Sequence, residues 1–278
     1  MDKLAIAKNA ERPPLSPADC EDGWTLHELD TVDSTNRHAA ALPEWSAVTA
    51  RTQTAGRGRH ERRWVSDAGG LWLSAVVPAP GEFECWNLLP LAAGLAVCQA
   101  LSSFGLAGHR LRWPNDIMIG PAKLAGILVE RFRPTTAVVG IGINFDNRPE
   151  DTDPALAGTV ARLAALLPVP PSRAEVREAV LEALRQAHAL LATGRAAELV
   201  NQLSPYWRRI PVRLTLRPDA AQIDGCFAGV DPSGRLLLAN TGSARSFAPH
   251  DVELLRELSP TYTDPTDTDL SCTNPSPF

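Results

Sequence analysis

Apolar and polar residues alternate over the run from Trp24 to Val32, and such alternation is typical of a half-buried β-strand. Further short β-prone runs follow in the first half of the chain. Strands are predicted over residues 24–32, 47–53, 71–77, 110–113, 116–119, 124–131 and 137–145. Apolar residues at helical spacing replace this pattern over residues 87–104, which predicts a long helix there. The polar segment Asp33-Ser34-Thr35-Asn36 offers N-cap side chains for a short helix over residues 37–42.

The second half of the chain begins with helices and ends in β-strands. An amphipathic helix is predicted over residues 172–191, opened by a capping box of Ser172 and Glu175, and a second helix is predicted over residues 196–203. Short strands are predicted over residues 212–216, 226–230, 236–239 and 251–255, with a turn at 231–234. These strands favour a small barrel-like domain.

We therefore predict an α+β chain in four parts. A disordered leader covers residues 1–22, where prolines interrupt any regular element, and a large mixed domain covers residues 23–207. A small β domain covers residues 208–257, and a disordered tail without a basic residue covers 258–278.

Composition excludes several functional classes. The chain has 278 residues and a net charge of −5, which argues against DNA binding through an overall positive field. No uninterrupted apolar run approaches the roughly 18 residues of a membrane span, and no signal-peptide core is present, so a cytoplasmic protein is expected. The motifs G-x-S-x-G, G-x-x-x-x-G-K-[ST] and G-x-G-x-x-G are absent, which removes the main support for common hydrolase, P-loop and Rossmann interpretations.

The cysteines and histidines point to no metal site. The five cysteines are widely scattered without a C-x-x-C pair, so neither a disulfide framework nor a zinc site is indicated, and incidental thiols are expected. The six histidines lack metal-ligand spacing as well.

A basic glycine loop follows the second predicted strand. Five arginines and one acid lie between Arg51 and Arg63, around the segment Gly56-Arg57-Gly58-Arg59 and just before Trp64. Glycines let backbone N–H groups approach a phosphate, arginines bind its oxygens, and a tryptophan offers a face to an adenine ring. A solvated turn with incidental arginines is the alternative interpretation.

Lys123 is the only lysine outside the leader, because the other two are Lys3 and Lys8. Its ammonium is a compact charge that an arginine does not replace. If the Gly120-Pro121 turn closes a hairpin, Asp116 and Lys123 face one cavity from opposing strands; the alternative is an ordinary cross-strand ion pair. Asn144, after the run Gly140-Ile141-Gly142, is a candidate for binding a base or ribose, or equally for capping the next turn.

Five segments, taken in order, resemble the motif series of the biotin protein ligases. They are Asp33 to Asn36, the Gln53 to Arg59 loop with Trp64, Trp113-Pro114-Asn115-Asp116, Lys123 to Glu130, and Gly140 to Asn144. The resemblance covers residues 24–256 and implies a catalytic domain similar to class II aminoacyl-tRNA synthetases and biotin/lipoate ligases, with a mixed β-sheet and flanking helices. A small SH3-like barrel would follow it. It does not include a helix-turn-helix module, so the repressor activity of longer family members is not implied.

The resemblance also implies roles for individual residues. A biotin site would include Ser34, Thr35, Asn36, Gln53, Arg57, Gly58, Arg59, Lys123 and Gly126. An ATP site would include Arg57, Arg59, Trp64, Asn115, Lys123 and Asn144. The residues of the chemical steps would be Lys123, Arg59 and Asp116, the last as an orienting group or a base.

The activity implied is the ligation of biotin, with ATP and Mg²⁺, through biotinyl-5′-AMP to a lysine of a biotin carboxyl carrier protein. A homodimer is a further possibility. Two other functions remain open: a lipoate or octanoate ligase or transferase, and a binding protein that retains biotinyl-adenylate without transferring it.

Overall fold

The computed structural model describes residues 23–79, 83–240, 243–258 and 272. The predictions for the leader 1–22 and for most of the tail therefore lie outside the described residues. The larger sheet has seven strands in the order β1-β2-β3-β7-β6-β5-β4. These strands are β1 (Thr25–Val32), β2 (Ser46–Gln53), β3 (Leu71–Pro78), β4 (His109–Arg112), β5 (Asp116–Ile119), β6 (Ala122–Arg133) and β7 (Thr136–Ile143). The pair β1–β2 is parallel and the others are antiparallel, which confirms the predicted mixed sheet.

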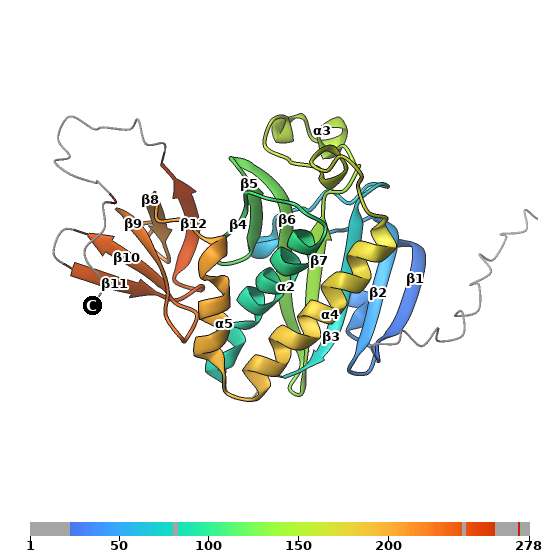
Figure 1. The fold of residues 1–278 in the computed structure, drawn as a ribbon, viewed down its shortest axis with the longest axis horizontal. Helices are drawn as coiled ribbons and strands as arrows, with labels where there is room; N and C mark the ends of the chain where they lie inside the picture. The colour runs from blue at the N-terminus through green and yellow to red at the C-terminus, as the bar shows by residue number, and fades with distance from the viewer. Residues whose placement is uncertain (1–22, 80–82, 241–242, 259–271, 273–278) are drawn as a thin grey trace, which may run out of the picture.

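Two long helices, α2 (Leu89–Ser103) and α4 (Arg173–Ala192), cover one face of this sheet (Figure 1). The shorter helix α5 (Ala196–Leu203) packs against both of them. The predicted capping box is confirmed, because Ser172 Oγ accepts from Glu175 N while Ser172 N donates to the Glu175 carboxylate. The stretch Cys85–Ser103 is long and apolar enough to cross a membrane, but 67% of it is buried inside the protein, where α2 packs on α4. It is therefore a core helix.

The short helix α1 (Thr35–Ala39) lies on the other face of the sheet, where it packs with β2, β3 and β7. Smaller pieces complete the described chain: α3 (Pro149–Thr152) and 3-10 turns at Arg59–Glu61, Phe83–Asn87, Pro154–Leu156, Leu163–Ala165 and Ser204–Tyr206.

Side-chain alternation along β3, β6 and β7 separates a core face from a second face. Leu73, Ile141 and Ile127 belong to the main core beneath α2 and α4. Their neighbours Trp72, Gly142 and Gly126 point the opposite way and stand side by side in the sheet register. Because two of these three positions are glycine, this second face is hollowed where the strands meet.

The C-terminal strands form a second, antiparallel sheet of order β11-β10-β9-β8-β12. They are β8 (Pro211–Leu216), β9 (Gln222–Val230), β10 (Leu236–Asn240), β11 (Ser243–Phe247) and β12 (Val252–Glu257). A small C-terminal β unit was predicted, but β11 was not, because four of its five residues are exposed and carry no hydrophobic alternation. This sheet adjoins the larger body through the Arg110–Glu257 ion pair and through Trp113 Nε1, which donates to the Gly234 carbonyl.

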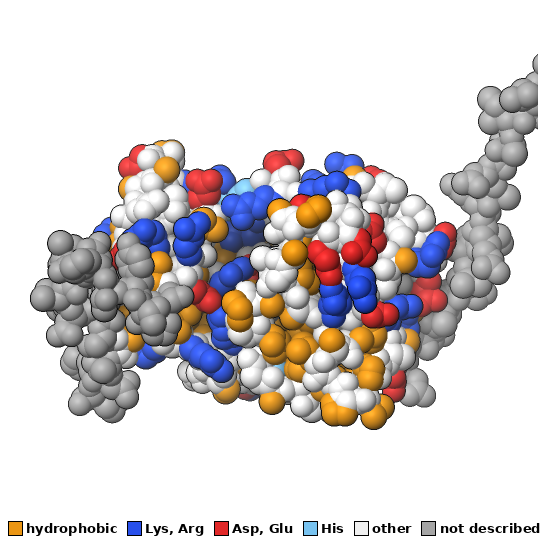
Figure 2. Space-filling view, turned by 90° about the horizontal axis from the view of Figure 1, so that it is seen from above, with side chains coloured by type: hydrophobic (Ala, Val, Ile, Leu, Met, Phe, Trp, Pro, Cys, Tyr) orange, Lys and Arg blue, Asp and Glu red, His pale blue; other side chains and the backbone are white. Residues whose placement is uncertain are grey.

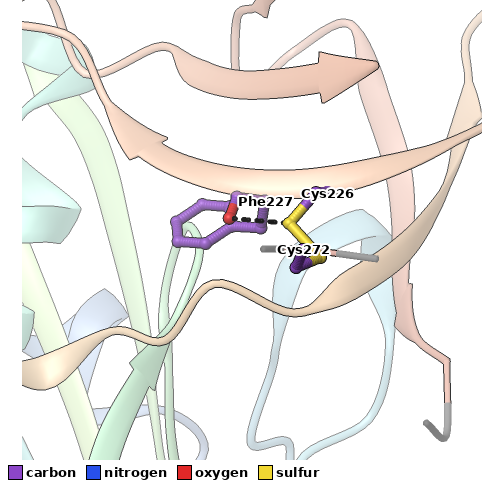
Figure 3. The surroundings of a disulfide bond; sticks show 3 residues. All are labelled: Cys226, Phe227 and Cys272. Carbon is purple, nitrogen blue, oxygen red and sulfur yellow. Dashed lines mark hydrogen bonds between the residues drawn. A yellow bond between two sulfur atoms is a disulfide. The ribbon is translucent and has the colours of Figure 1, made fainter. Parts of the chain in front are cut away.

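The prediction of unpaired thiols is wrong for two cysteines. Cys226 of β9 and Cys272 form a disulfide, with their Cα atoms 6.0 Å apart (Figure 3). They are 46 residues apart in the sequence, so no local spacing predicts the disulfide. Only the folded chain brings the two cysteines together. Cys85 and Cys98 are free thiols, and burial raises the pKa of Cys98.

Two buried histidines, His109 and His188, are expected to make the fold less stable in mild acid. His109 Nε2 lies 3.0 Å from the Cys98 carbonyl and His188 Nε2 lies 2.9 Å from the Pro78 carbonyl, and burial lowers the pKa of both rings below 6.5. The unfolded chain therefore takes up these protons first. Their contribution to stability is complete above about pH 6.5 and declines as the pH falls through the lowered folded-state values.

We expect the thermal unfolding midpoint, followed by circular dichroism between pH 7 and pH 5, to fall less in His188→Gln than in the unsubstituted protein. Glutamine retains an amide donor for the Pro78 carbonyl but does not titrate. The matched control is His250→Gln, because His250 is exposed and should follow the unsubstituted protein. A His188→Gln curve parallel to that of the unsubstituted protein would show that His188 has no part in this dependence.

Candidate functional site

A cavity of about 310 Å³ lies over the hollowed face of the large sheet. Its floor comes from β3, β6 and β7, its walls from α1 and the segment before β5, and its cover from the basic loop after β2. Every residue selected from the sequence lines it: Ser34, Thr35, Asn36, Gln53, Arg57, Gly58, Arg59, Trp64, Asn115, Asp116, Lys123, Gly126 and Asn144. Arg59 and Lys123 thus share one cavity although 63 residues separate them in the sequence.

Glycines on the floor create the space for two side chains of the site. A Cβ on Gly142 would lie 2.6 Å from Trp64 Nε1, and one on Gly140 would lie 2.3 Å from Asn36 Oδ1. The Trp64 ring also covers Gly126, whose Cβ would lie 3.0 Å from the ring. The pattern Gly140-Ile141-Gly142 is therefore explained by strand alternation, with isoleucine in the core and glycine beneath the cavity.

Hydrogen bonds between buried polar groups shape one end of the cavity. Gln53 Oε1 accepts from both the backbone N and the hydroxyl of Thr35, at 2.8 and 3.0 Å. Ser74 Oγ lies 2.7 Å from Thr35 Oγ1 and 2.5 Å from Asn36 Oδ1. Sequence reasoning missed Ser74, and the available signal was its place on the cavity face of β3, between Trp72 and Val76. Within the segment predicted to offer N-cap side chains, Ser34 holds the N-cap position of α1 but makes no side-chain cap bond.

The basic loop folds as a small hairpin over the cavity. Gly58 N donates to the Arg62 carbonyl at 2.7 Å, and Trp64 N donates to the Gly56 carbonyl at 2.9 Å. His60 and Glu61 both occupy the left-handed region, with φ of 55° and 59°, a conformation that non-glycine residues rarely adopt. The loop is therefore a folded hairpin whose Arg57, Gly58 and Arg59 line the cavity.

Arg59 joins the loop to the rest of the site. It donates to the Pro249 carbonyl at 2.9 Å and lies 3.5 Å from Asn115 Oδ1. Burial lowers the pKa of its guanidinium, and the charge of Asp116 opposes that shift. Beside it, Arg217 donates to His60 Nδ1 at 2.8 Å, so the second sheet contacts the loop at two points.

Lys123 and Asp116 meet across the β5–β6 hairpin. The Lys123 ammonium lies 2.6 Å from Asp116 Oδ1, and Arg112 Nη2 lies 2.7 Å from Asp116 Oδ2. Lys123 also stands 4.8 Å from the centroid of the Trp64 ring, a cation–π contact. Burial alone would raise the pKa of Asp116, but the two cations outweigh it and hold that pKa below its usual value. The predicted facing pair is confirmed, as an ion pair that also lines the cavity.

The two asparagines of the site are held by backbone carbonyls. Asn115 Nδ2 donates to the Ile127 carbonyl at 2.8 Å. Asn144 Nδ2 lies 3.3 Å from the Lys123 carbonyl, and its Oδ1 accepts from Asn147 at 3.0 Å. Because Asn144 is 3% exposed and bonded at both ends of its amide, the structure favours the turn-capping interpretation for it.

Strand β12 supplies a wall of the cavity that sequence reasoning did not anticipate. Val252, Glu253, Leu254 and Leu255 line it from the second sheet. Lys and Arg side chains gather on the face of the molecule where this sheet adjoins the larger body (Figure 2). The site can therefore hold an anionic ligand between a glycine-lined floor and a cover of arginines.

Comparison with known proteins gives consistent results. A family model described as the biotin/lipoate A/B protein ligase family matches residues 28–146. The biotin–[acetyl-CoA-carboxylase] ligase of Mycobacterium tuberculosis is 32% identical over 275 residues, which cover 88% of this chain and 97% of that protein. The enzyme of the same name from Paracoccus denitrificans is 34% identical over 229 residues, 76% of this chain and 92% of that protein.

The fold matches a solved ligand complex as well. The biotin protein ligase from Aquifex aeolicus in complex with biotin and ATP superposes with a TM-score of 0.74 at 28% identity, covering 84% of this chain and 99% of that one.

Proposed function

Since this chain belongs to the biotin protein ligases of the biotin/lipoate A/B ligase family, we propose that it joins biotin to a lysine of a biotin carboxyl carrier protein through biotinyl-5′-AMP. The chain is a ligase enzyme of this family, and its relatives are named for acetyl-CoA carboxylase as the protein acted on. The observation that carries the proposal is one cavity containing Arg57, Arg59 and Lys123, drawn from two distant chain segments.

The polar end of the cavity suits the bicyclic urea of biotin. Thr35, Asn36 and Gln53 offer hydroxyl and amide groups, and buried groups of this kind reject ligands that leave them unpaired. Trp64 offers an apolar wall, and its indole N–H is buried without a hydrogen-bond partner among the described residues. An unpaired buried donor costs free energy, so a ligand acceptor at this place would stabilise the site. The cavity volume lies within the range of about 300–1,000 Å³ typical of small-molecule sites.

We assign the phosphates of ATP to the arginine loop and Lys123. Guanidinium groups bind phosphate oxygens with paired hydrogen bonds, and an ammonium adds a compact charge. Magnesium would enter as Mg–ATP with phosphate oxygens among its ligands, since no group of three or more His, Cys, Asp or Glu residues in the described part of the chain is placed to hold a metal. Trp64 is proposed to lie beside the adenine.

The reaction has two steps. An oxygen of the biotin carboxylate forms a bond to the α-phosphorus of ATP while the bond to the bridging oxygen breaks, and pyrophosphate leaves. The ε-amine of the acceptor lysine then attacks the acyl carbon, AMP leaves with its oxygen, and the surplus proton passes to solvent. Lys123 and Arg59 stabilise the negative charge that develops on the phosphoryl oxygens in the first step.

We assign Asp116 the role of orienting Lys123. Two cations hold the pKa of this carboxylate below its usual value, so it is a weak proton acceptor at neutral pH. Its contact at 2.6 Å with the Lys123 ammonium instead fixes the position of that group.

Biotin-dependent exchange of pyrophosphate into ATP tests the proposal. We expect exchange with biotin and none above background with lipoate or octanoate, because neither offers a urea to the polar end of the cavity. Exchange that responds to lipoate would favour the lipoate ligase alternative. Transfer is followed by measuring the intact mass of a carrier domain. Formation of the adenylate without such transfer would favour the alternative, a binding protein that retains biotinyl-adenylate.

A cytoplasmic location is also part of the proposal, because the carrier protein is proposed as the acceptor there. The homodimer and the absence of DNA binding stay predictions.

A further inference from the structure

Glu130 of β6 binds two residues of the cavity although it does not line the cavity itself. Its Oε1 accepts from Arg57 Nη2 at 2.8 Å, and its Oε2 accepts from Asn36 Nδ2 at 2.7 Å. The Glu130 side chain is 20% exposed and that of Arg57 is 26% exposed, so the pair is shielded from much of the solvent screening that weakens surface ion pairs. One carboxylate thus joins the basic loop to helix α1.

The hydrogen-bond chain continues into the core of the larger sheet. Asn36 Oδ1 accepts from the hydroxyl of Ser74, which is fully buried. The amide lies directly over Gly140, where a Cβ would approach within 2.3 Å of Asn36 Oδ1, so a larger residue there would displace it. A continuous chain of hydrogen bonds therefore runs from strand β3 to the loop that covers the cavity, through Ser74, Asn36, Glu130 and Arg57.

We propose that Glu130 is a positioning residue that sets the places of Asn36 and Arg57 at the polar end of the cavity and so determines the affinity for biotin. This inference rests on the proposed function. Both neighbours present N–H donors, so the position requires two acceptor oxygens, which a carboxylate supplies. Glutamine keeps the size of the side chain but turns one acceptor into a donor facing another donor.

The effect should fall on binding and not on the chemical step. In the sheet register Asp116 pairs with Gly126, whereas Glu130 pairs with Val138, four residues farther along β6. At the rise of a β-strand this separation is about 13 Å. Lys123 and Asp116, which carry the proposed charge contacts, therefore lie away from Glu130 itself and do not contact it.

The experiment measures biotin-dependent pyrophosphate exchange and direct biotin binding by calorimetry in Glu130→Gln. We expect the KM and Kd for biotin to rise roughly tenfold, with kcat within about twofold, because a charge-assisted pair that shapes the site is lost. Glu130→Asp keeps both oxygens on a shorter stem and should recover part of the affinity. In an Arg57→Gln background, Glu130→Gln should add less than it does alone, since the contact with Arg57 is already lost and only the contact with Asn36 remains to be disturbed.

Asp224→Asn is the matched control. Asp224 pairs with Arg213 across β8 and β9, with side-chain exposures of 27% and 32%, outside the cavity lining. The Asp224→Asn substitution breaks a comparable ion pair and should leave the KM for biotin unchanged. If Glu130→Gln does not fold, Glu130→Asp carries the same test, with a smaller expected rise in KM.

Several results would overturn the inference alone. These are an unchanged KM in Glu130→Gln, a loss confined to kcat, an equal rise in Asp224→Asn, or a full additional effect in the Arg57→Gln background. Failure of the proposed function is recognised separately, because the unsubstituted protein would then show no biotin-dependent exchange.

Discussion

Replacing Lys123 by arginine is expected to lower the rate of biotin adenylation by two or more powers of ten, the magnitude typical of removing one preorganised charge contact. The ammonium is confined by Asp116 at 2.6 Å and by the Trp64 ring at 4.8 Å. It also lies over Gly126, where an added Cβ would approach it within 3.1 Å. A guanidinium is broader and planar, so it keeps the charge but cannot place it at the same point.

The measurement is single-turnover formation of biotinyl-adenylate, with biotin binding and thermal unfolding measured in parallel. Arg245→Lys is the matched control, because Arg245 lies over the ring of Phe247, 5.1 Å from its centroid, in the second sheet. This substitution also exchanges an arginine and a lysine over an aromatic ring, but outside the cavity, and should leave the rate of adenylation unchanged. Near-normal adenylation by Lys123→Arg would remove Lys123 from the proposed chemistry.

Local patterns were sufficient to predict the large sheet and its helices. Short β-prone runs identified β2, β3 and β7, whose side chains are largely buried. The helix α4 was predicted at its first residue because its capping box uses only side chains within one turn. Strand β11 was not predicted because it is an edge strand with one buried residue. Its sequence therefore has no alternation of apolar and polar residues.

Contacts between distant segments were beyond sequence reasoning. The Cys226–Cys272 disulfide, the wall contributed by β12 and the bond from Arg59 to the Pro249 carbonyl each depend on how the two sheets and the C-terminal segment come together. Glu130 was read as the end of a motif, and its role as a link between Asn36 and Arg57 needed the register of β6. Local chemistry is visible in a sequence, whereas the partners of a side chain are set by topology.

The two interpretations of Lys123 and Asp116 turned out to be compatible. The residues form a cross-strand ion pair, as the simpler interpretation held, and they also line the cavity beside Arg59. An ion pair of this kind is not evidence of function by itself, because structural pairs are common. Its place beneath the arginine loop is what connects it to phosphoryl chemistry.

Replacing Asp116 by asparagine is expected to slow both half-reactions by about tenfold or more, since the ammonium of Lys123 would lose the charge that holds it. Asparagine matches the carboxylate in size, leaves Arg112 and Lys123 without their shared counter-charge, and keeps one acceptor oxygen. Adenylation is measured by pyrophosphate exchange, and transfer by a single turnover of preformed biotinyl-adenylate with a carrier domain.

The two half-reactions separate an orienting role from a role as base. A base for the incoming amine acts only in the transfer step, so its loss would leave the rate of adenylation unchanged. Loss of a group that orients Lys123 would instead lower the rate of adenylation itself. The cations that lower the pKa of Asp116 keep it ionised down to acid pH, so an orienting role predicts adenylation that does not depend on its titration near neutrality. Normal adenylation with impaired transfer in Asp116→Asn would assign the residue as the base, and Asp224→Asn again controls for the loss of a paired carboxylate.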